Sequence, residues 1–202
     1  MDPVTQGALG AAVALTKARP KQLAGAALIG ALGGMAPDLD VLIRSSTDSL
    51  LFLEYHRQFT HSLLFVPIGA LLCALALSPL LGKRFDLTFS SVYTFCVLGY
   101  ATHGLLDACT TYGTLLLWPL SYERVAWNVL SIIDPLVTLP LLLGIFWTVR
   151  SKSSAPILLA LAWFGSYVAV GVVQRDRAEA VAWELALARG HSPQRLEAKP
   201  SF

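Results

Sequence analysis

Residues 101–113, ATHGLLDACTTYG, form the polar end of an apolar segment that begins at Leu87. The length and composition of this segment are typical of a membrane-spanning helix. In a helix, His103 and Asp107 stand one turn apart on the same face, so an imidazole nitrogen and a carboxylate can bind one ion. Ionisable groups in a membrane cost about 2.5–3.5 kcal/mol each at the bilayer centre, which favours a functional role. The alternative is a structural His–Asp hydrogen bond that joins two helices.

The composition of the chain indicates an integral membrane protein. Of 202 residues, 55% are hydrophobic and only 14% are charged, and the mean hydropathy is +0.60. A soluble domain would need more polar surface than this. The net charge of +2 and the scattered Lys and Arg residues exclude nucleic acid as an expected partner. Cys73, Cys96 and Cys109 lack paired spacing, so we expect neither a disulfide framework nor a cysteine zinc site.

Apolar segments divide the chain into successive helices. We expect a short, half-length helix at residues 3–16 and longer segments at residues 22–37, 62–81, 87–107, 135–150 and 153–174. Met1-Asp2-Pro3 carries no basic region, so a removable signal peptide is not expected. The sequence therefore predicts an all-α, polytopic membrane helical bundle of about five spans or near-spans. Residues 1–174 would form the transmembrane domain, and residues 175–202 an amphipathic helix with a short tail.

The motif Pro37-Asp38-Leu39-Asp40 places two acids at the end of an apolar run. An extended backbone would put Asp38 and Asp40 on the same side, whereas a helix would turn them well apart. Two carboxylates this close repel each other unless a positive charge lies between them. The pair is therefore either part of a metal site or a helix cap with solvated acids.

A second motif carries two histidines, His56 and His61, on either side of Arg57 and Thr60. Residues five apart do not share a helix face, but a turn ending near Thr60, with Thr60 capping the next helix, would bring both rings inward. Arg57 would hold an anionic oxygen of a substrate with two parallel hydrogen bonds. The alternatives are structural histidines and a salt bridge from Arg57 to Glu54 or to an acid of the site.

The expected spans separate the acids and histidines from the basic residues. One membrane face would hold Asp2, Asp38, Asp40, His56, His61, His103, Asp107 and Asp134. The other face would hold Lys17, Arg19, Lys21, Lys83, Arg84, Arg150 and Lys152. Because short basic loops stay in the cytoplasm, the site is expected on the extracytoplasmic face. The basic residues after position 174 follow an odd number of crossings and fall on the side of the site.

Five motifs carry a resemblance to a known family. MDPVTQG at residues 1–7, PDLD at 37–40, HRQFTHS at 56–62, HGLLD at 103–107 and IDP at 133–135 resemble, in order and spacing, the YdjM-like family of membrane-bound metal-dependent hydrolases. The resemblance covers nearly the whole chain. Many members have His where this chain has Gln6, and longer members continue into a further, more polar region, so this chain resembles a shortened version.

A more distant resemblance bears on mechanism. The order of Asp40, His56 or His61, and then His103 and Asp107 is similar to the ligand order of zinc-dependent phospholipases C and of related fungal single-strand nucleases. The likeness implies a zinc site that cleaves phosphoesters. In those enzymes the N-terminal residue itself helps to bind metal, which would explain an acid as close to the start as Asp2.

These observations lead to a functional hypothesis. We expect a multi-pass protein of a bacterial inner membrane that hydrolyses a small phosphoester or a phospholipid head group, with membrane lipid as its surroundings. The expected metal ligands are Asp2, Asp40, His56, His61, His103 and Asp107, and the expected catalytic residues are Asp38, Arg57 and Asp134. Imidazole and carboxylate ligands favour Zn²⁺ as the divalent ion, with Mn²⁺ or Mg²⁺ as alternatives. The competing hypothesis is a non-enzymatic membrane protein whose buried His and Asp residues serve ion passage or helix docking.

Overall fold

The chain forms a bundle of helices. A computed structural model describes residues 1–45, 47–48 and 50–200, and all regular elements in these residues are helical, as predicted. The longer helices are α1 (Pro3–Leu15), α2 (Leu23–Met35), α4 (Val66–Leu77), α5 (Phe89–Ala108), α6 (Pro135–Ser151) and α7 (Ala155–Ala188). The shorter ones are the 3₁₀ turns η1 (Ala36–Leu42), η2 (Phe59–His61) and η3 (Leu63–Phe65), the α-helix α3 (Leu51–Tyr55) and the π-helix η4 (Ser78–Gly82).

The lengths of the helices agree with a membrane protein. Within the described residues, three helical stretches are long and apolar enough to cross a membrane, namely Leu23–Leu42, Leu63–Gly82 and Ala155–Ala188. α1 and α6 are apolar but shorter, as the sequence predicted for the first of them. The expected run at residues 62–81 is built from η3, α4 and η4 in succession.

Helices α1, α2 and α5 form the tightly packed centre of the bundle. A Cβ atom added to Gly99 of α5 would stand 2.2 Å from the carbonyl oxygen of Gly30 in α2, and one added to Gly10 of α1 would stand 2.4 Å from the same oxygen. Side chains at these positions would force the helices apart, so glycine lets their backbones touch. This contact brings the end of α5 against the end of α2.

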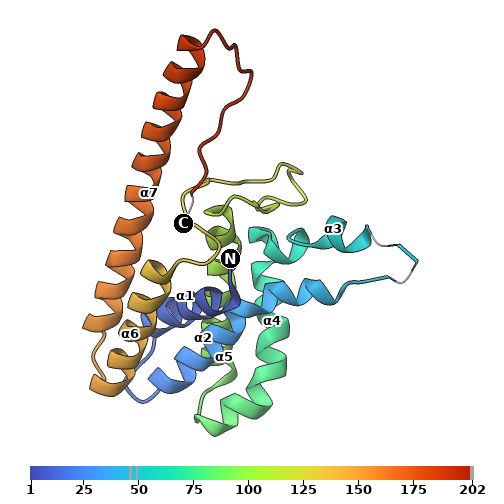
Figure 1. The fold of residues 1–202 in the computed structure, drawn as a ribbon. Coiled ribbons are helices and arrows are strands. Elements are labelled where there is room, and N and C mark those ends of the chain that lie inside the picture. The colour runs from blue at the N-terminus through green and yellow to red at the C-terminus, as the bar shows by residue number, and fades with distance from the viewer. Residues whose placement is uncertain (46, 49, 201–202) are drawn as a thin grey trace.

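The connections between helices gather at opposite ends of the bundle. Figure 1 shows the α1–α2, α4–α5 and α6–α7 connections at the lower end, and these connections carry Lys17, Lys83 and Lys152. The connections that include η1, η2 and residues 109–134 lie toward the other end, where α5 also finishes. The predicted separation of basic loops from the acids and histidines is thus visible in the fold. Which side of the membrane each end faces stays a prediction.

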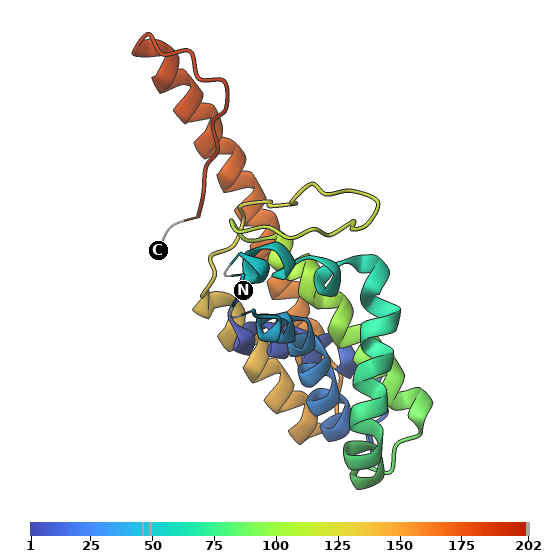
Figure 2. The same ribbon diagram turned by 90° about the vertical axis from the view of Figure 1, so that its right-hand side faces the viewer.

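Helix α7 differs from the sequence-based expectation. We predicted a last span at residues 153–174 and, from Arg175, an amphipathic helix that ends at Gly190. The structure joins the two into one helix, α7, from Ala155 to Ala188. Its only proline, Pro156, lies in the first turn, where proline is tolerated, and Gly165 and Gly171 do not break the helix. Its second half projects beyond the bundle, and the C-terminal segment runs back beside it (Figures 1 and 2).

Candidate metal centre

Four side chains converge where α5, η1 and η2 meet. They are Asp38 of η1, His61 of η2, and His103 and Asp107 of α5, and one possible ligand atom from each lies within 4.8 Å of the others. We call this group the metal cluster. The two Nε2 atoms of the histidines are 2.9 Å apart, Asp38 Oδ1 lies 3.3 Å from His103 Nε2, and Asp107 Oδ2 lies 3.3 Å from His61 Nε2. Three of the expected metal ligands, His61, His103 and Asp107, thus lie together, and the fourth member is Asp38, which the sequence analysis assigned a catalytic role.

Local structure explains how the cluster is assembled. His103 and Asp107 are one helical turn apart on α5, as their spacing predicted. Gly104 lies between them, and a Cβ atom there would stand 2.2 Å from the carbonyl oxygen of His61. The hydroxyl of Tyr100 donates a hydrogen bond of 2.9 Å to the carbonyl of Thr60. The turn that carries His61 is thus held directly on the surface of α5.

The second ring nitrogen of each histidine is fixed by an outer partner. His103 Nδ1 lies 2.6 Å from the carbonyl oxygen of Gly34, which can only accept, so Nδ1 is the donor. His61 Nδ1 faces Thr60 Oγ1 at 3.0 Å and Asp40 Oδ2 at 3.4 Å. Thr60 donates its own proton to Asp40, so its oxygen accepts from His61. Outer partners of this kind orient metal-binding histidines and set their tautomer.

This arrangement makes the Nε2 lone pairs of His61 and His103 face each other. With Nδ1 of each ring acting as donor, the neutral His61 and His103 both turn an acceptor Nε2 toward the same point, 2.9 Å apart. Burial alone lowers the pKa of His61, but the carboxylates of Asp107 and Asp38 outweigh it and raise that pKa above its ordinary value. The centre of the cluster therefore favours positive charge. Two imidazoles and two carboxylates suit a tetrahedral zinc ion, and the same donors also accept other divalent ions.

The two carboxylate oxygens of Asp107 have different surroundings. The amino group of Met1 and the amide of Gln6 (3.0 Å) donate to its Oδ1. Its Oδ2 is buried, faces the histidines and receives no hydrogen bond from the described residues. A buried carboxylate oxygen without a donor is costly, and a cation at the cluster would satisfy it. The residues present thus fit a divalent metal ion.

Asp40 and His56, both predicted as metal ligands, form a pair beside the cluster. Asp40 turns away from Asp38 because η1 is a 3₁₀ helix, so the helical alternative for the Asp-x-Asp motif is the observed one. Asp40 Oδ1 lies 2.9 Å from His56 Nδ1, and Oδ2 accepts from the backbone N–H of Arg57 at 2.9 Å. Thr60 does not cap the next helix as expected, because its hydroxyl donates a hydrogen bond to Asp40. Ser62 caps η3 instead.

Asp2 and Asp134 lie at the starts of helices rather than in the metal cluster. Asp2 caps α1 by accepting from the N–H of Thr5 at 3.0 Å. Asp134 caps α6 by accepting from the N–H of Leu136 at 3.1 Å, and its other oxygen accepts from the hydroxyl of Tyr167 at 3.0 Å. Both acids therefore act as helix N-caps. Neither belongs to the metal cluster, although Asp2 was predicted as a metal ligand and Asp134 as a catalytic residue.

Arg57 lies between the two groups. Its φ is +60°, and its side chain is 10% exposed. Nε lies 3.3 Å from Asp107 Oδ2, which is an ion pair with an acid of the site, but neither Nε nor Nη1 makes an aligned hydrogen bond with any described residue. The guanidinium also lies over the ring of Tyr112, 4.6 Å from its centre. Nε and Nη1 of this buried guanidinium therefore make no hydrogen bond within the described part of the chain.

The metal cluster opens into a pocket of about 700 Å³, which we call the α2–α4 pocket. Its polar end is formed by Met1, Asp38, His56 and Arg57, and its apolar walls by Leu32, Met35, Leu39, Cys73 and Leu77, together with Pro3, Ala36, Val41 and Ala76. Of the four cluster residues, Asp38 lines this pocket, and its side chain is 25% exposed while the other three are 0% exposed. A molecule that reaches the cluster from this pocket thus passes Asp38.

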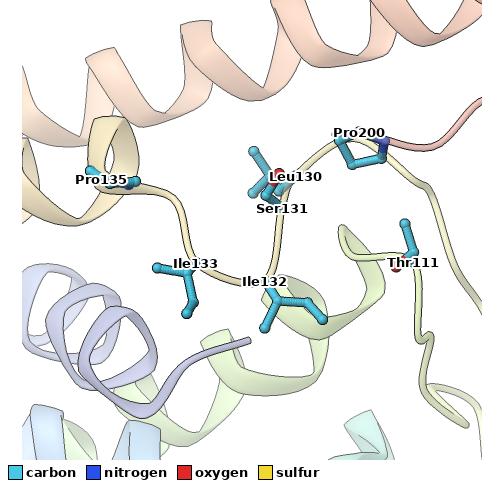
Figure 3. Close-up of a pocket in the computed structure, with 7 residues that line it drawn as sticks. All are labelled: Thr111, Leu130, Ser131, Ile132, Ile133, Pro135 and Pro200. Atoms are coloured by element: carbon cyan, nitrogen blue, oxygen red, sulfur yellow. The ribbon is translucent and has the colours of Figure 1, made fainter. Parts of the chain in front are cut away.

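A second pocket of about 690 Å³ lies between the α5–α6 connection and the C-terminal segment. Figure 3 shows its lining, Thr111, Leu130, Ser131, Ile132, Ile133, Pro135 and Pro200. None of these seven described residues is ionisable. Of these two pockets, only the α2–α4 pocket has ionisable residues in the lining that the structure describes.

Three partners of the cluster were missed by the sequence analysis. Gln6 was noted only as a departure from the family motif, yet its amide holds Asp107. The carbonyl of Gly34 orients His103, and a backbone group leaves no signal in residue identity. Thr60 was assigned to a helix cap, although its place next to His61 could have indicated an outer partner.

Comparison with known proteins agrees with the motifs. Residues 1–178 match a family model described as YdjM inner membrane protein. The chain is 34% identical over 108 residues to "Inner membrane protein YbcI" of Escherichia coli (strain K12), and 28% identical over 116 residues to "Uncharacterized protein YfhP" of Bacillus subtilis (strain 168). These matches cover 51% and 57% of the chain, and the chain spans 60% and 34% of the two relatives. No solved structure matches the chain.

Proposed function

We propose that this chain, which belongs to the YdjM family of inner membrane proteins, is a metal-dependent hydrolase that cleaves a phosphoester. The observation that carries the proposal is the convergence of two imidazole Nε2 atoms and two carboxylates beside a guanidinium whose donors lack acceptors. The imidazole and carboxylate cluster supports a divalent cation, and the guanidinium supports an anionic substrate. Structural His–Asp pairs would instead leave each donor and acceptor satisfied.

The metal cluster would hold the ion through Asp38, His61, His103 and Asp107. When bound, a divalent ion activates water as a nucleophile at neutral pH and offsets negative charge on phosphoryl oxygens. Zinc suits this donor set best, and Mn²⁺ or Mg²⁺ are the alternatives. In the hydrolysis, the water oxygen bonds to phosphorus, the bond from phosphorus to the alcohol oxygen breaks, and the alcohol leaves with a proton.

Arg57 would hold the phosphoryl group. The guanidinium stands 3.3 Å from the Asp107 carboxylate of the cluster, so a phosphoryl group bound at the cluster would lie beside it. The oxygens of a phosphoryl group match the planar donors of arginine. This role accounts for the buried Nε and Nη1 atoms, which find no hydrogen-bond acceptor among the described residues.

His56 would exchange protons with the substrate. It lines the α2–α4 pocket, and Asp40 holds its Nδ1 at 2.9 Å. A carboxylate hydrogen-bonded to one ring nitrogen fixes the orientation and the tautomer of the imidazole. The same Asp40 faces His61, so it would support both the metal cluster and the proton-transfer step.

The test compares metal content and phosphoester hydrolysis on the same preparations. Arg57→Lys keeps the charge and loses the planar pair of donors, so we expect full metal content and a fall in kcat/KM of about a hundredfold. Arg84→Lys is the matched control, because Arg84 also lies over an aromatic ring, that of Phe85 at 5.9 Å, but does not line the pocket. We expect it to match the parent.

Two outcomes would contradict this proposal. Unchanged hydrolysis in Arg57→Lys would remove the phosphoryl-holding role of Arg57. No hydrolysis by the metal-loaded parent, across a panel of phosphomonoesters and phosphodiesters, would favour a non-enzymatic ion-binding protein.

A further inference from the structure

The walls of the α2–α4 pocket belong to stretches that are long and apolar enough to cross a membrane. Leu32, Met35 and Leu39 lie on the stretch Leu23–Leu42, and Cys73 and Leu77 lie on the stretch Leu63–Gly82. Leu32 is 37% exposed, Met35 39% and Leu39 62%. Exposed apolar side chains on a membrane-spanning stretch contact lipid, because no other apolar partner covers them. The pocket therefore opens toward hydrocarbon along its walls.

The other end of the same pocket is the polar entrance to the metal cluster. Asp38, His56, Arg57 and the N-terminal residue line it there. A ligand that fills the pocket must therefore be anionic at one end and apolar at the other. A free phosphate or a small soluble phosphoester would leave the apolar walls without a partner, whereas a volume of about 700 Å³ is in the range of pockets that enclose whole small molecules.

We infer that the substrate is a membrane phospholipid, whose phosphoryl group reaches the metal cluster while its acyl chain lies between α2 and α4. This inference rests on the proposed function and names its substrate class. The lipid enters sideways from the bilayer past Leu39 and Met35, so it need not leave the membrane. Water adds across the bond between phosphorus and an alcohol oxygen, as in the proposed hydrolysis. With phosphatidic acid the alcohol is diacylglycerol, which returns to the bilayer with the proton on its oxygen, and inorganic phosphate leaves through the polar end.

The test uses two pairs of substrates that share a phosphoester bond and differ in acyl chains. The pairs are dioleoylphosphatidic acid with glycerol 3-phosphate, and dioleoylphosphatidylglycerol with glycerophosphoglycerol. Ala76→Trp fills the pocket from α4, and Ala76 is exposed, so the fold should tolerate the change. Leu75→Trp is the matched control, because Leu75 is its exposed neighbour (57%) outside the pocket lining.

We expect Ala76→Trp to keep its metal and to lose about tenfold or more of kcat/KM on the lipids, with little change on the soluble esters. Leu75→Trp should match the parent on both. A second readout does not depend on catalysis: dioleoylphosphatidic acid should slow the alkylation of Cys73 by N-ethylmaleimide in detergent micelles, and glycerol 3-phosphate should not. Cys96 and Cys109 are buried, and peptide mass spectrometry distinguishes them from Cys73.

The failures are distinguishable. If the parent hydrolyses the soluble esters only, and Cys73 reacts at one rate with and without lipid, the lipid inference is overturned and the proposed function stands. If Ala76→Trp loses the lipid and soluble activities equally with metal retained, the acyl chain does not lie in this pocket. If the metal-loaded parent hydrolyses none of the four compounds or any wider phosphoester panel, both proposals fall.

Discussion

Asp107 and Asp134 are both buried carboxylates at the ends of helices, yet their surroundings are opposite. Both oxygens of Asp134 accept hydrogen bonds, one from the N–H of Leu136 and one from the hydroxyl of Tyr167. Asp107 accepts two donors on Oδ1, while Oδ2 faces the histidines with no hydrogen bond from the described chain. Burial alone therefore does not distinguish the two acids. They differ because Asp107 keeps an oxygen without a hydrogen-bond donor facing the other members of the metal cluster.

The largest expected effect comes from removing a member of the metal cluster. His103→Ala or Asp107→Ala should leave the ion short of its coordination, so we expect the purified variants to have lost most of their metal. Asp134→Asn is the control and should retain the parent's metal content. Elemental analysis of the three variants checks this. Equal metal content in all of them would show that Asp107 and His103 do not bind the metal.

A smaller loss should follow when the turn carrying His61 is pushed away from α5. Gly104→Ala places a methyl group 2.2 Å from the carbonyl of His61, so the turn must shift and metal affinity should fall. Gly165→Ala is the matched control, because no neighbouring atom of the described chain lies within 4 Å of its Cβ position. Competition with a chelator measures both affinities. Equal affinities would show that the position of the His61 backbone is unimportant.

Removing the charge of Asp40 should weaken metal binding less than removing a ligand and more than changing the helix cap Asp134. Asp40→Asn removes the charge that faces His61 and His56, and changes to outer partners of metal ligands typically weaken binding by about 10–100-fold. The dissociation constant of the metal, measured beside that of Asp134→Asn, tests this order. An Asp40→Asn protein with the affinity of the parent would leave His61 oriented by Thr60 alone.

The smallest effect is expected at Tyr167. Tyr167→Phe removes a hydrogen bond to Asp134, so the free energy of unfolding should fall by about 1 kcal/mol while metal content stays unchanged. Thermal unfolding and elemental analysis on one preparation give both values. Loss of metal would contradict the separation of the two acids.

The sequence predicted the helical bundle because apolar segment length and charge placement are local properties. The pairing of His103 with Asp107 was also predictable, since helical spacing alone puts them on one face. The choice between Asp38 and Asp40 was not, because it depends on the 3₁₀ geometry that follows α2. The roles of Gln6 and of the Gly34 carbonyl depend on how α1, α2 and α5 cross, which no single segment specifies.

The positive φ of Arg57 bears on which residues can stand at position 57. A positive φ disfavours a residue with a side chain by about 1 kcal/mol, and glycine would adopt it freely. The carbonyl and N–H of Arg57 nevertheless bind Leu115 and Asp40, so the conformation itself is required. Glycine at position 57 would remove this conformational cost, but it would also remove the ion pair with Asp107 and the contact with the ring of Tyr112. Arginine at a position whose backbone suits glycine therefore indicates that the side chain, and not the turn, decides which residue is tolerated there.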